Sequence, residues 1–138
     1  MAEAAWMLDT NTLSALIRSP RGRLLHQILA REPEQLCTSV IVASELRFGA
    51  RRKNSPELSR RVEQMLGGIN ILPLDGTVDA HYADIRAILE AAGTPIGAND
   101  LFIAAHARSR DLALVTHNLR EFNRVPGLRV ENWMDGQA

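Results

Sequence analysis

Short apolar runs alternate along the chain with longer segments of mixed polarity. The apolar runs are Ala5–Asp9, Gln35–Ser39, Ile69–Leu74 and Leu112–Thr116, with Arg129–Val130 as a short fifth. Their length and nearly continuous apolar character are typical of strands that are buried on both faces of a sheet.

The intervening segments carry helical patterns. Between Val78 and Ala92, apolar residues recur at Val78, Tyr82, Ile85 and Leu89, which is the spacing of one helix face. The other predicted helices are Thr12–Arg18, Arg21–Arg31, a segment capped by Thr38 or Ser39 that runs to about Lys53, Pro56–Leu66 and Asn99–Arg110. Strands that alternate with helices predict an α/β fold, in which a central, mainly parallel sheet of four to five strands has helices on both faces.

Length and composition narrow the class of protein. The chain has 138 residues, of which 46% are hydrophobic and 23% charged, and we expect one domain over residues 1–138. The longest apolar stretches fall far short of the roughly 20 residues that span a bilayer, and Met1–Ala5 shows no secretory signal. The single cysteine, Cys37, cannot form an internal disulfide, which fits a reducing cytosol but does not exclude other compartments. We expect a cytoplasmic protein with no membrane partner.

The charges cancel, with 16 basic and 16 acidic residues, so net charge indicates no particular partner. The basic set is nevertheless uneven, because Lys53 is the only lysine among these 16 residues. Arginine suits bidentate contact with phosphate, although genome base composition also enriches it. Both interpretations of the arginine excess stay open.

Three acidic residues are candidates for chemistry. Asp9 ends the first predicted strand, where parallel sheets gather ligands, although aspartate is also common in turns and helix caps. Glu45 lies on an apolar helix face, so its carboxylate must be paired, hydrogen-bonded, protonated or metal-bound. The alternatives to a metal are a salt bridge to a nearby arginine such as Arg47 or Arg51, or a place at the edge of that face. Asp100 opens a helix, where the dipole favours a carboxylate in any case.

Asn118 follows the fourth predicted strand and should reach the same sheet edge as Asp9. The neighbouring His117 could act as a base, but an isolated loop histidine is more often inert. Carboxylates that converge at one edge repel one another, and a divalent cation resolves that repulsion. Oxygen ligands without a Cys or His cluster favour Mg²⁺ or Mn²⁺ over Zn²⁺, and such an ion assists the hydrolysis of a phosphodiester.

Four segments in this order resemble the motifs of PIN-domain ribonucleases: Met7–Asn11, Ser44–Gly49, Asn99–Ala105 and Thr116–Phe122. The tail Val125–Trp133 resembles the VapC toxin branch of bacterial type II toxin–antitoxin systems. The resemblance covers residues 7–133, nearly the whole chain. Each motif alone is weak evidence, whereas the ordered set is specific.

The resemblance implies a PIN-like three-layer α/β/α sandwich and a homodimer that forms a larger hetero-oligomer with a VapB-type antitoxin. It also implies a Mg²⁺-dependent endoribonuclease toxin, with Mn²⁺ as a possible substitute and tRNA as a plausible target. A PIN-like module that binds RNA or protein with weak or no catalysis is the alternative.

The resemblance also assigns roles to residues. Asp9, Glu45 and Asp100 would be the catalytic acids and hold the metal, Glu45 either directly or through water. A fourth acidic position of the family falls on Asn118, which would be the fourth catalytic residue. Its amide can hold a metal-bound water but brings no charge, so a second metal site is expected to be weaker or absent. Asn11 and Thr116 would hydrogen-bond the metal-binding side chains. The helix that carries Glu45 also supplies three candidates for RNA contact: Arg47, Arg51 and Arg52.

Overall fold

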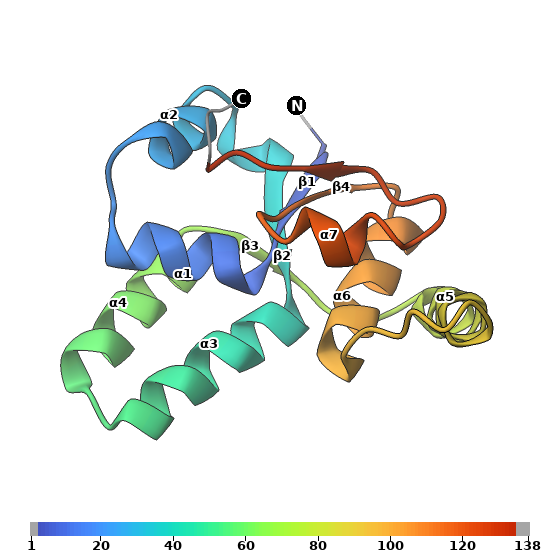
Figure 1. Ribbon diagram of the computed structural model, residues 1–138. Coiled ribbons are helices and arrows are strands. Elements are labelled where there is room, and N and C mark those ends of the chain that lie inside the picture. Colours follow the sequence, from blue (N-terminus) through green and yellow to red (C-terminus); the bar gives the residue numbers. More distant parts are fainter. Residues whose placement is uncertain (1–2, 135–138) are drawn as a thin grey trace.

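The computed structural model describes residues 3–134 (Figure 1). Residues 1–2 and 135–138, which the expected unit of 1–138 includes, lie outside the described residues.

A parallel sheet of five strands forms the centre of the molecule. The strands are β1 (Trp6–Leu8), β2 (Leu36–Ser39), β3 (Asn70–Leu72), β4 (Ala113–Val115) and β5 (Val130–Glu131). Their spatial order is β3-β2-β1-β4-β5, and every neighbouring pair is parallel. In the register of the central strands, Met7 pairs with Cys37 on one side and with Leu114 on the other. All three of these side chains are fully buried, as expected for strands covered on both faces.

Seven α-helices and one 3₁₀ turn connect the strands within residues 3–134. They are α1 (Thr10–Arg18), α2 (Arg23–Leu29), η1 (Pro33–Gln35), α3 (Val40–Lys53), α4 (Pro56–Gly67), α5 (Val78–Ala91), α6 (Ala98–Ser109) and α7 (Leu119–Phe122). Side-chain caps begin three of the helices. Asp9 accepts from the Thr12 amide at α1, Ser39 accepts from the Ile41 amide at α3, and Ser55 accepts from the Leu58 amide at α4.

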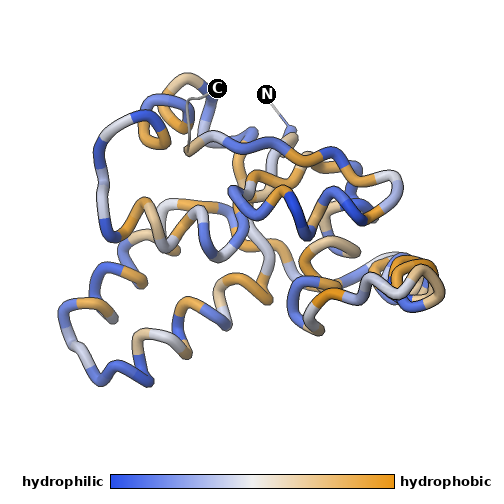
Figure 2. The backbone as a smooth tube through the Cα atoms, in the orientation of Figure 1, coloured by the Kyte–Doolittle hydropathy of each residue, from blue (hydrophilic) through white to orange (hydrophobic). Residues whose placement is uncertain are grey.

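The direction of the chain decides which face each helix covers. From β1 to β3 the strands are added in one direction, and from β4 to β5 they are added on the other side of β1. Because parallel crossovers are right-handed, α1–α4 cover one face and α5–α6 the other. Figure 1 shows these two groups on opposite sides of the strands, and Figure 2 shows hydrophobic and hydrophilic residues alternating along their helices. The α/β/α sandwich predicted from the sequence is confirmed.

The differences from the predicted elements are local. The strands are shorter than the apolar runs, because Pro73 and the polar residues at the run ends leave the ladder. The short α7 and η1 were not predicted, since four or fewer residues carry no periodicity. Within residues 3–134 no helix is both long and apolar enough to cross a membrane.

Candidate active site

The strand order creates a crevice at the carboxyl edge of the sheet. The chain leaves β1 toward one face and reaches β4 from the other, so the sheet has its topological switch point between these two strands. Asp9 directly follows β1, and Thr116 directly follows β4. Both side chains are buried, and they lie beside each other because the main-chain amide of Asp9 donates to the carbonyl of Val115 at 3.1 Å.

Asp9 serves as a helix cap and also lies in the crevice. Its Oδ1 accepts a hydrogen bond from the Thr12 amide at 2.8 Å, and the side chain is only 3% exposed. Burial raises the pKa of Asp9, while hydrogen bonds from Thr116 and Thr12 oppose that rise. The capping role considered for Asp9 and its place at the sheet edge are therefore both present in one residue.

Glu45 is half-buried at the edge of the apolar face of α3. The Thr10 hydroxyl donates to its Oε1, and the Asn99 amide Nδ2 donates to its Oε2 at 3.0 Å. A salt bridge to Arg47 or Arg51, which was the alternative to a metal, is absent among the described residues, and Arg47 instead pairs with Glu63 of α4 at 2.9 Å. Both partners of Glu45 are neutral, so its negative charge is hydrogen-bonded but not neutralised.

Asp100 lies in the first turn of α6 and is half-buried. Burial raises the pKa of Asp100 to about 8, with further contributions from a hydrogen bond and repulsion with Glu121 and from repulsion by Glu45 and Asp9. Asp100 therefore lies within electrostatic range of three other carboxylates, and Glu121, which also forms a hydrogen bond with it, makes the largest contribution to this repulsion.

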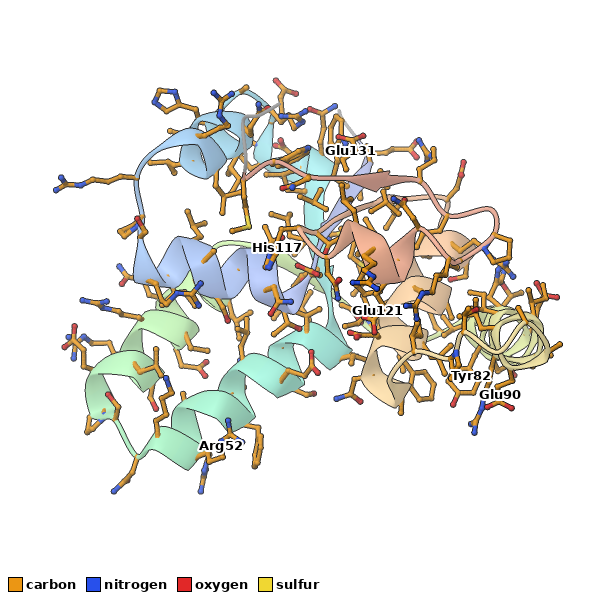
Figure 3. The ribbon with its side chains drawn as sticks, viewed as in Figure 1. Arg52, Tyr82, Glu90, His117, Glu121 and Glu131 are labelled. Carbon is orange, nitrogen blue, oxygen red and sulfur yellow. The ribbon has the colours of Figure 1, made fainter. Side chains whose placement is uncertain are left out.

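Glu121 is the site residue that the sequence analysis missed. It belongs to α7, and Figure 3 shows its side chain extending from α7 toward α6. Its Oε1 accepts from Asn118 Nδ2 at 3.0 Å, so the two residues act as a pair. Asn118 lacks charge, as expected, but Glu121 brings a carboxylate to the same place. The i, i+3 spacing from Asn118 was the available signal, since residues so spaced share a helix face.

The two predicted hydrogen-bonding residues behave differently. Thr116 is fully buried. Its hydroxyl donates a hydrogen bond to the Asp9 carboxylate and accepts one from the main-chain amide of Asn118 at 2.9 Å. Asn11 is exposed, and within residues 3–134 its side chain makes no hydrogen bond. Thr10 and Asn99, which bind Glu45, hold the position that was expected for Asn11.

The three arginines of α3 also differ. Arg47 forms a bidentate pair with Glu63, at 2.9 and 3.0 Å, which fastens α3 to α4. Arg51 is exposed and forms no ion pair within the described part of the chain. The Arg52 guanidinium lies 5.7 Å from the centroid of the Phe48 ring, and Figure 3 shows it on α3 well away from Glu121.

The donor set of the site fits a divalent cation. It consists of the carboxylates of Asp9, Glu45, Asp100 and Glu121, none of which forms an ion pair within residues 3–134. Oxygen ligands of high negative charge suit Mg²⁺ and Mn²⁺. In the described residues no three such side chains already stand close enough together to hold an ion. The charge and the oxygen ligands therefore suit a divalent cation, and the side chains would have to rotate toward one another to bind it.

A buried contact joins the two helices that carry Glu45 and Asp100. Ser39, the cap of α3, lies 2.8 Å from Nδ1 of His106 on α6. The Ser39 hydroxyl accepts from the Ile41 amide, so its proton is free to bond Nδ1. His106 is fully buried, and its Nε2 has no hydrogen-bond partner among the described residues. Burial, together with Arg110, lowers the pKa of His106.

This contact predicts a loss of stability at acidic pH. The pKa of His106 is lower in the folded than in the unfolded chain, so the unfolded state takes up the proton first. The free energy of unfolding should therefore fall as the pH drops below about 6.5. His106→Asn keeps an acceptor for Ser39 without titrating, and should flatten this fall in urea denaturation at pH 5–8. His26→Asn, on the exposed surface, is the control, and equal slopes for both variants would contradict the prediction.

A pair of variants separates the two roles of Asp9. Asp9→Asn keeps an oxygen that caps α1, whereas Asp9→Ala removes it, so Asp9→Ala should be less stable than Asp9→Asn by about 1–2 kcal/mol in urea denaturation with EDTA. Since burial disfavours the charged form, Asp9→Asn should be no less stable than the wild type. Ser55→Ala calibrates the loss of a cap elsewhere. If both Asp9 variants lose the same stability, capping does not explain the position.

Comparison with known proteins places this geometry among related chains. Residues 6–128 match the model of the PIN domain family. The chain is 42% identical to the "Ribonuclease VapC2" of Haemophilus influenzae, covering 94% of this chain and 98% of the relative. It is 39% identical to the "tRNA(fMet)-specific endonuclease VapC" of Salmonella typhimurium, covering 93% and 97%. In the crystal structure of a DNA-bound VapBC from Salmonella typhimurium, one chain superposes with a TM-score of 0.86 at 38% identity, over 94% of this chain and 98% of that chain.

Proposed function

This chain belongs to the PIN domain family, in its VapC branch, and from that membership and its acidic cluster we propose that it is a metal-dependent endoribonuclease toxin. The observation that carries the proposal is that four carboxylates from four separate elements lie at one edge of the sheet, with no cationic side chain paired to them within residues 3–134. Such an arrangement costs folding energy, which a divalent cation would return on binding. The names of the VapC relatives supply RNA as the substrate class.

Each site residue would have a role that follows from its position. Asp9, Asp100 and Glu45 would hold Mg²⁺ or Mn²⁺, and Glu121 with Asn118 would complete the negative rim of the site. A bound ion would supply Lewis acidity and a water activated for attack on the phosphodiester. Thr10 and Asn99 would keep Glu45 oriented through its two oxygens, while Thr116 orients Asp9. Glu121 supplies the charge that Asn118 lacks.

Substrate and partner follow from the same family membership. We propose tRNA as the target class, because one relative is named a tRNA(fMet)-specific endonuclease. We propose a VapB-type antitoxin as the neutralising partner, because the similar structures include VapBC complexes. A homodimer that joins the antitoxin in a larger assembly, and a cytoplasmic location beside the RNA pool, complete the proposal.

The chemistry of the RNA ends tests the proposal. A metal-activated water needs no ribose 2′-hydroxyl, so a substrate with a 2′-deoxy sugar at the cleaved position should still be cut in Mg²⁺ and not in EDTA. The position itself comes from mapping new RNA ends after brief expression in cells. Cyclic phosphate ends, or cleavage that persists in EDTA, would contradict a metal-activated water. RNA binding without cleavage in either buffer would favour the alternative of a binding module.

The arginines of α3 allow a salt-dependence prediction. Arg51 and Arg52 form no ion pair with any residue that the structure describes, whereas Arg47 is paired with Glu63. Each phosphate contact contributes about 0.7 to the slope of log affinity against log salt for single-stranded RNA. Arg51→Ala or Arg52→Ala should therefore flatten the slope by about that amount, and Arg47→Ala should not. Slopes that stay at the wild-type value in all three variants would favour base composition as the source of the arginine excess.

A further inference from the structure

A hollow of about 150 Å³ lies directly beside Glu45, between α1, α3 and α4. We call it the α1–α3–α4 groove. Thr10 and Glu45 line it, so the groove is continuous with the acidic site. It extends away from that site along α3, as far as Arg52 and Lys53.

The lining of the groove combines apolar side chains, such as Leu46 and Val62, with three basic ones. The basic residues are Arg18 of α1 and Arg52 and Lys53 of α3, and among the described residues Glu45 is the only acidic one that lines the groove. Within residues 3–134 none of the three cations forms an ion pair. The neighbouring acids of α4 are already occupied, since Glu57 pairs with Arg60 and Arg61 and Glu63 pairs with Arg47. In Figure 2 the junction of α3 and α4 is the hydrophilic end of this helix pair.

The floor of the groove is open over α3. Gly49 lines it one helical turn after Glu45, and a Cβ added at Gly49 would meet no atom within 4 Å. The backbone of Gly49 has no positive φ, so the position does not require glycine for its conformation. Gly49 in mid-helix makes the helix less stable than alanine would at the same position. What glycine provides at this position is space beside Glu45.

We propose that the α1–α3–α4 groove holds the sugar–phosphate backbone of a single RNA strand next to the bond that is cut. The inference rests on the proposed function and adds to it the path of the substrate. Four carboxylates at the site repel a polyanion, so a strand can approach only if cations anchor the adjacent phosphates. Arg18, Arg52 and Lys53 supply three such charges in one place, and an acidic strand is the occupant that their charge favours.

Filling the groove tests the inference. A leucine at position 49 would extend over the preceding turn, toward Glu45, because helical side chains lean toward the N-terminus. We therefore expect Gly49→Leu to weaken the binding of a fluorescent single-stranded RNA of mixed sequence by tenfold or more, measured by anisotropy in EDTA. Gly49→Ala, which fills less of the groove, should weaken binding less. Both variants should melt no lower than the wild type, since each improves helix propensity.

Matched controls keep the result specific. Gly67→Leu makes the same change at the end of α4, where an added Cβ also meets no atom within 4 Å, and should leave RNA binding unchanged. Arg18→Gln and Lys53→Gln should each flatten the salt slope by about 0.7, whereas Arg86→Gln on α5 should not. Unchanged RNA affinity in Gly49→Leu overturns the inference, even if that variant loses a protein partner. Failure of the proposed function is read separately, as an absence of cleavage by the wild type in Mg²⁺.

Discussion

Replacing Glu45 with Gln is expected to lower RNA cleavage at least about 100-fold without unfolding the chain. The change removes one of the charges that would hold the ion. Weaker binding of the ion should remove several kcal/mol of transition-state stabilisation, which corresponds to a fall in rate of more than about 100-fold. The fold should tolerate it, because both present partners of Glu45 can adapt. The Thr10 hydroxyl can donate to the new amide oxygen, and the Asn99 amide can turn so that its oxygen accepts from the new NH₂.

A nearby glutamate supplies the matched control. Glu63→Gln removes the same charge from α4, where Glu63 is exposed and pairs with Arg47 outside the acidic cluster. Exposed pairs contribute little to stability, so Glu63→Gln should fold and cleave like the wild type. Single-turnover cleavage with excess enzyme measures both variants. Near wild-type cleavage by Glu45→Gln would show that the site has been drawn around the wrong residues.

The sequence predicted the strands and helices well because their signals are local. The i, i+4, i+7 and i+11 pattern of Val78–Ala92 is confirmed by α5, in which Val78, Ile85 and Leu89 are buried. The predicted cap at Thr38 or Ser39 is found at Ser39, and the predicted end near Lys53 is confirmed by α3. Burial of a periodic face and capping of a first turn both depend on residues within a few positions of one another.

The partners of the site residues could not be predicted in this way. Asn99 is 54 positions from Glu45, and the Thr10 hydroxyl reaches Glu45 only because α1 and α3 pack on the same face of the sheet. Arg47, one of the two arginines weighed as partners of Glu45, faces α4 instead. Residues two positions apart on a helix do not face each other, and that spacing argued against a Glu45–Arg47 pair from the start.

The position of Glu121 could not be predicted from the local sequence either. The family pattern directed attention to position 118, where the sequence has an uncharged asparagine. Whether a glutamate three positions later reaches the crevice depends on α7, a four-residue helix that only tertiary contacts stabilise. The structure brings Glu121 to Asp100, and this contact changes the expected electrostatics from three carboxylates to four.

Asp100 is where the cost of this crowding should be measured. The pKa of Asp100 is about 8 in the folded chain, against an ordinary value of 3.8. Well below pH 3.8 the Asp100 carboxyl is protonated in both the folded and the unfolded chain, so it does not lower the stability of the fold. Its ionisation destabilises the fold progressively as the pH rises, until the effect is complete above about pH 8. Asp100→Asn should therefore match the wild type near pH 4 and melt higher at pH 8.5 in EDTA.

The expected difference at pH 8.5 is about 1 kcal/mol, or roughly 4 °C, after allowance for the solvent that screens a half-exposed carboxylate. Asp79→Asn is the control, because Asp79 also lies in a first helical turn, that of α5, but outside the cluster. It shares any loss of interaction with the helix dipole and should lack the gain in melting temperature.

Mg²⁺ should raise the melting temperature of the wild type more than that of Asp100→Asn, whereas in EDTA the variant melts higher. An ion that binds only the folded state adds about 2.7 kcal/mol at a hundredfold excess over its dissociation constant, and Asp100→Asn should gain much less than the wild type. Because the ion must displace the Asp100 proton, the wild-type gain should increase from pH 6 to 8. Thermal melts of the wild type, Asp100→Asn and Asp79→Asn, with and without Mg²⁺ at pH 4, 6 and 8.5, test these expectations. If Asp100→Asn melts lower in EDTA at pH 8.5 and gains as much from Mg²⁺ as the wild type, Asp100 stabilises α6 as a first-turn acid and holds no ion.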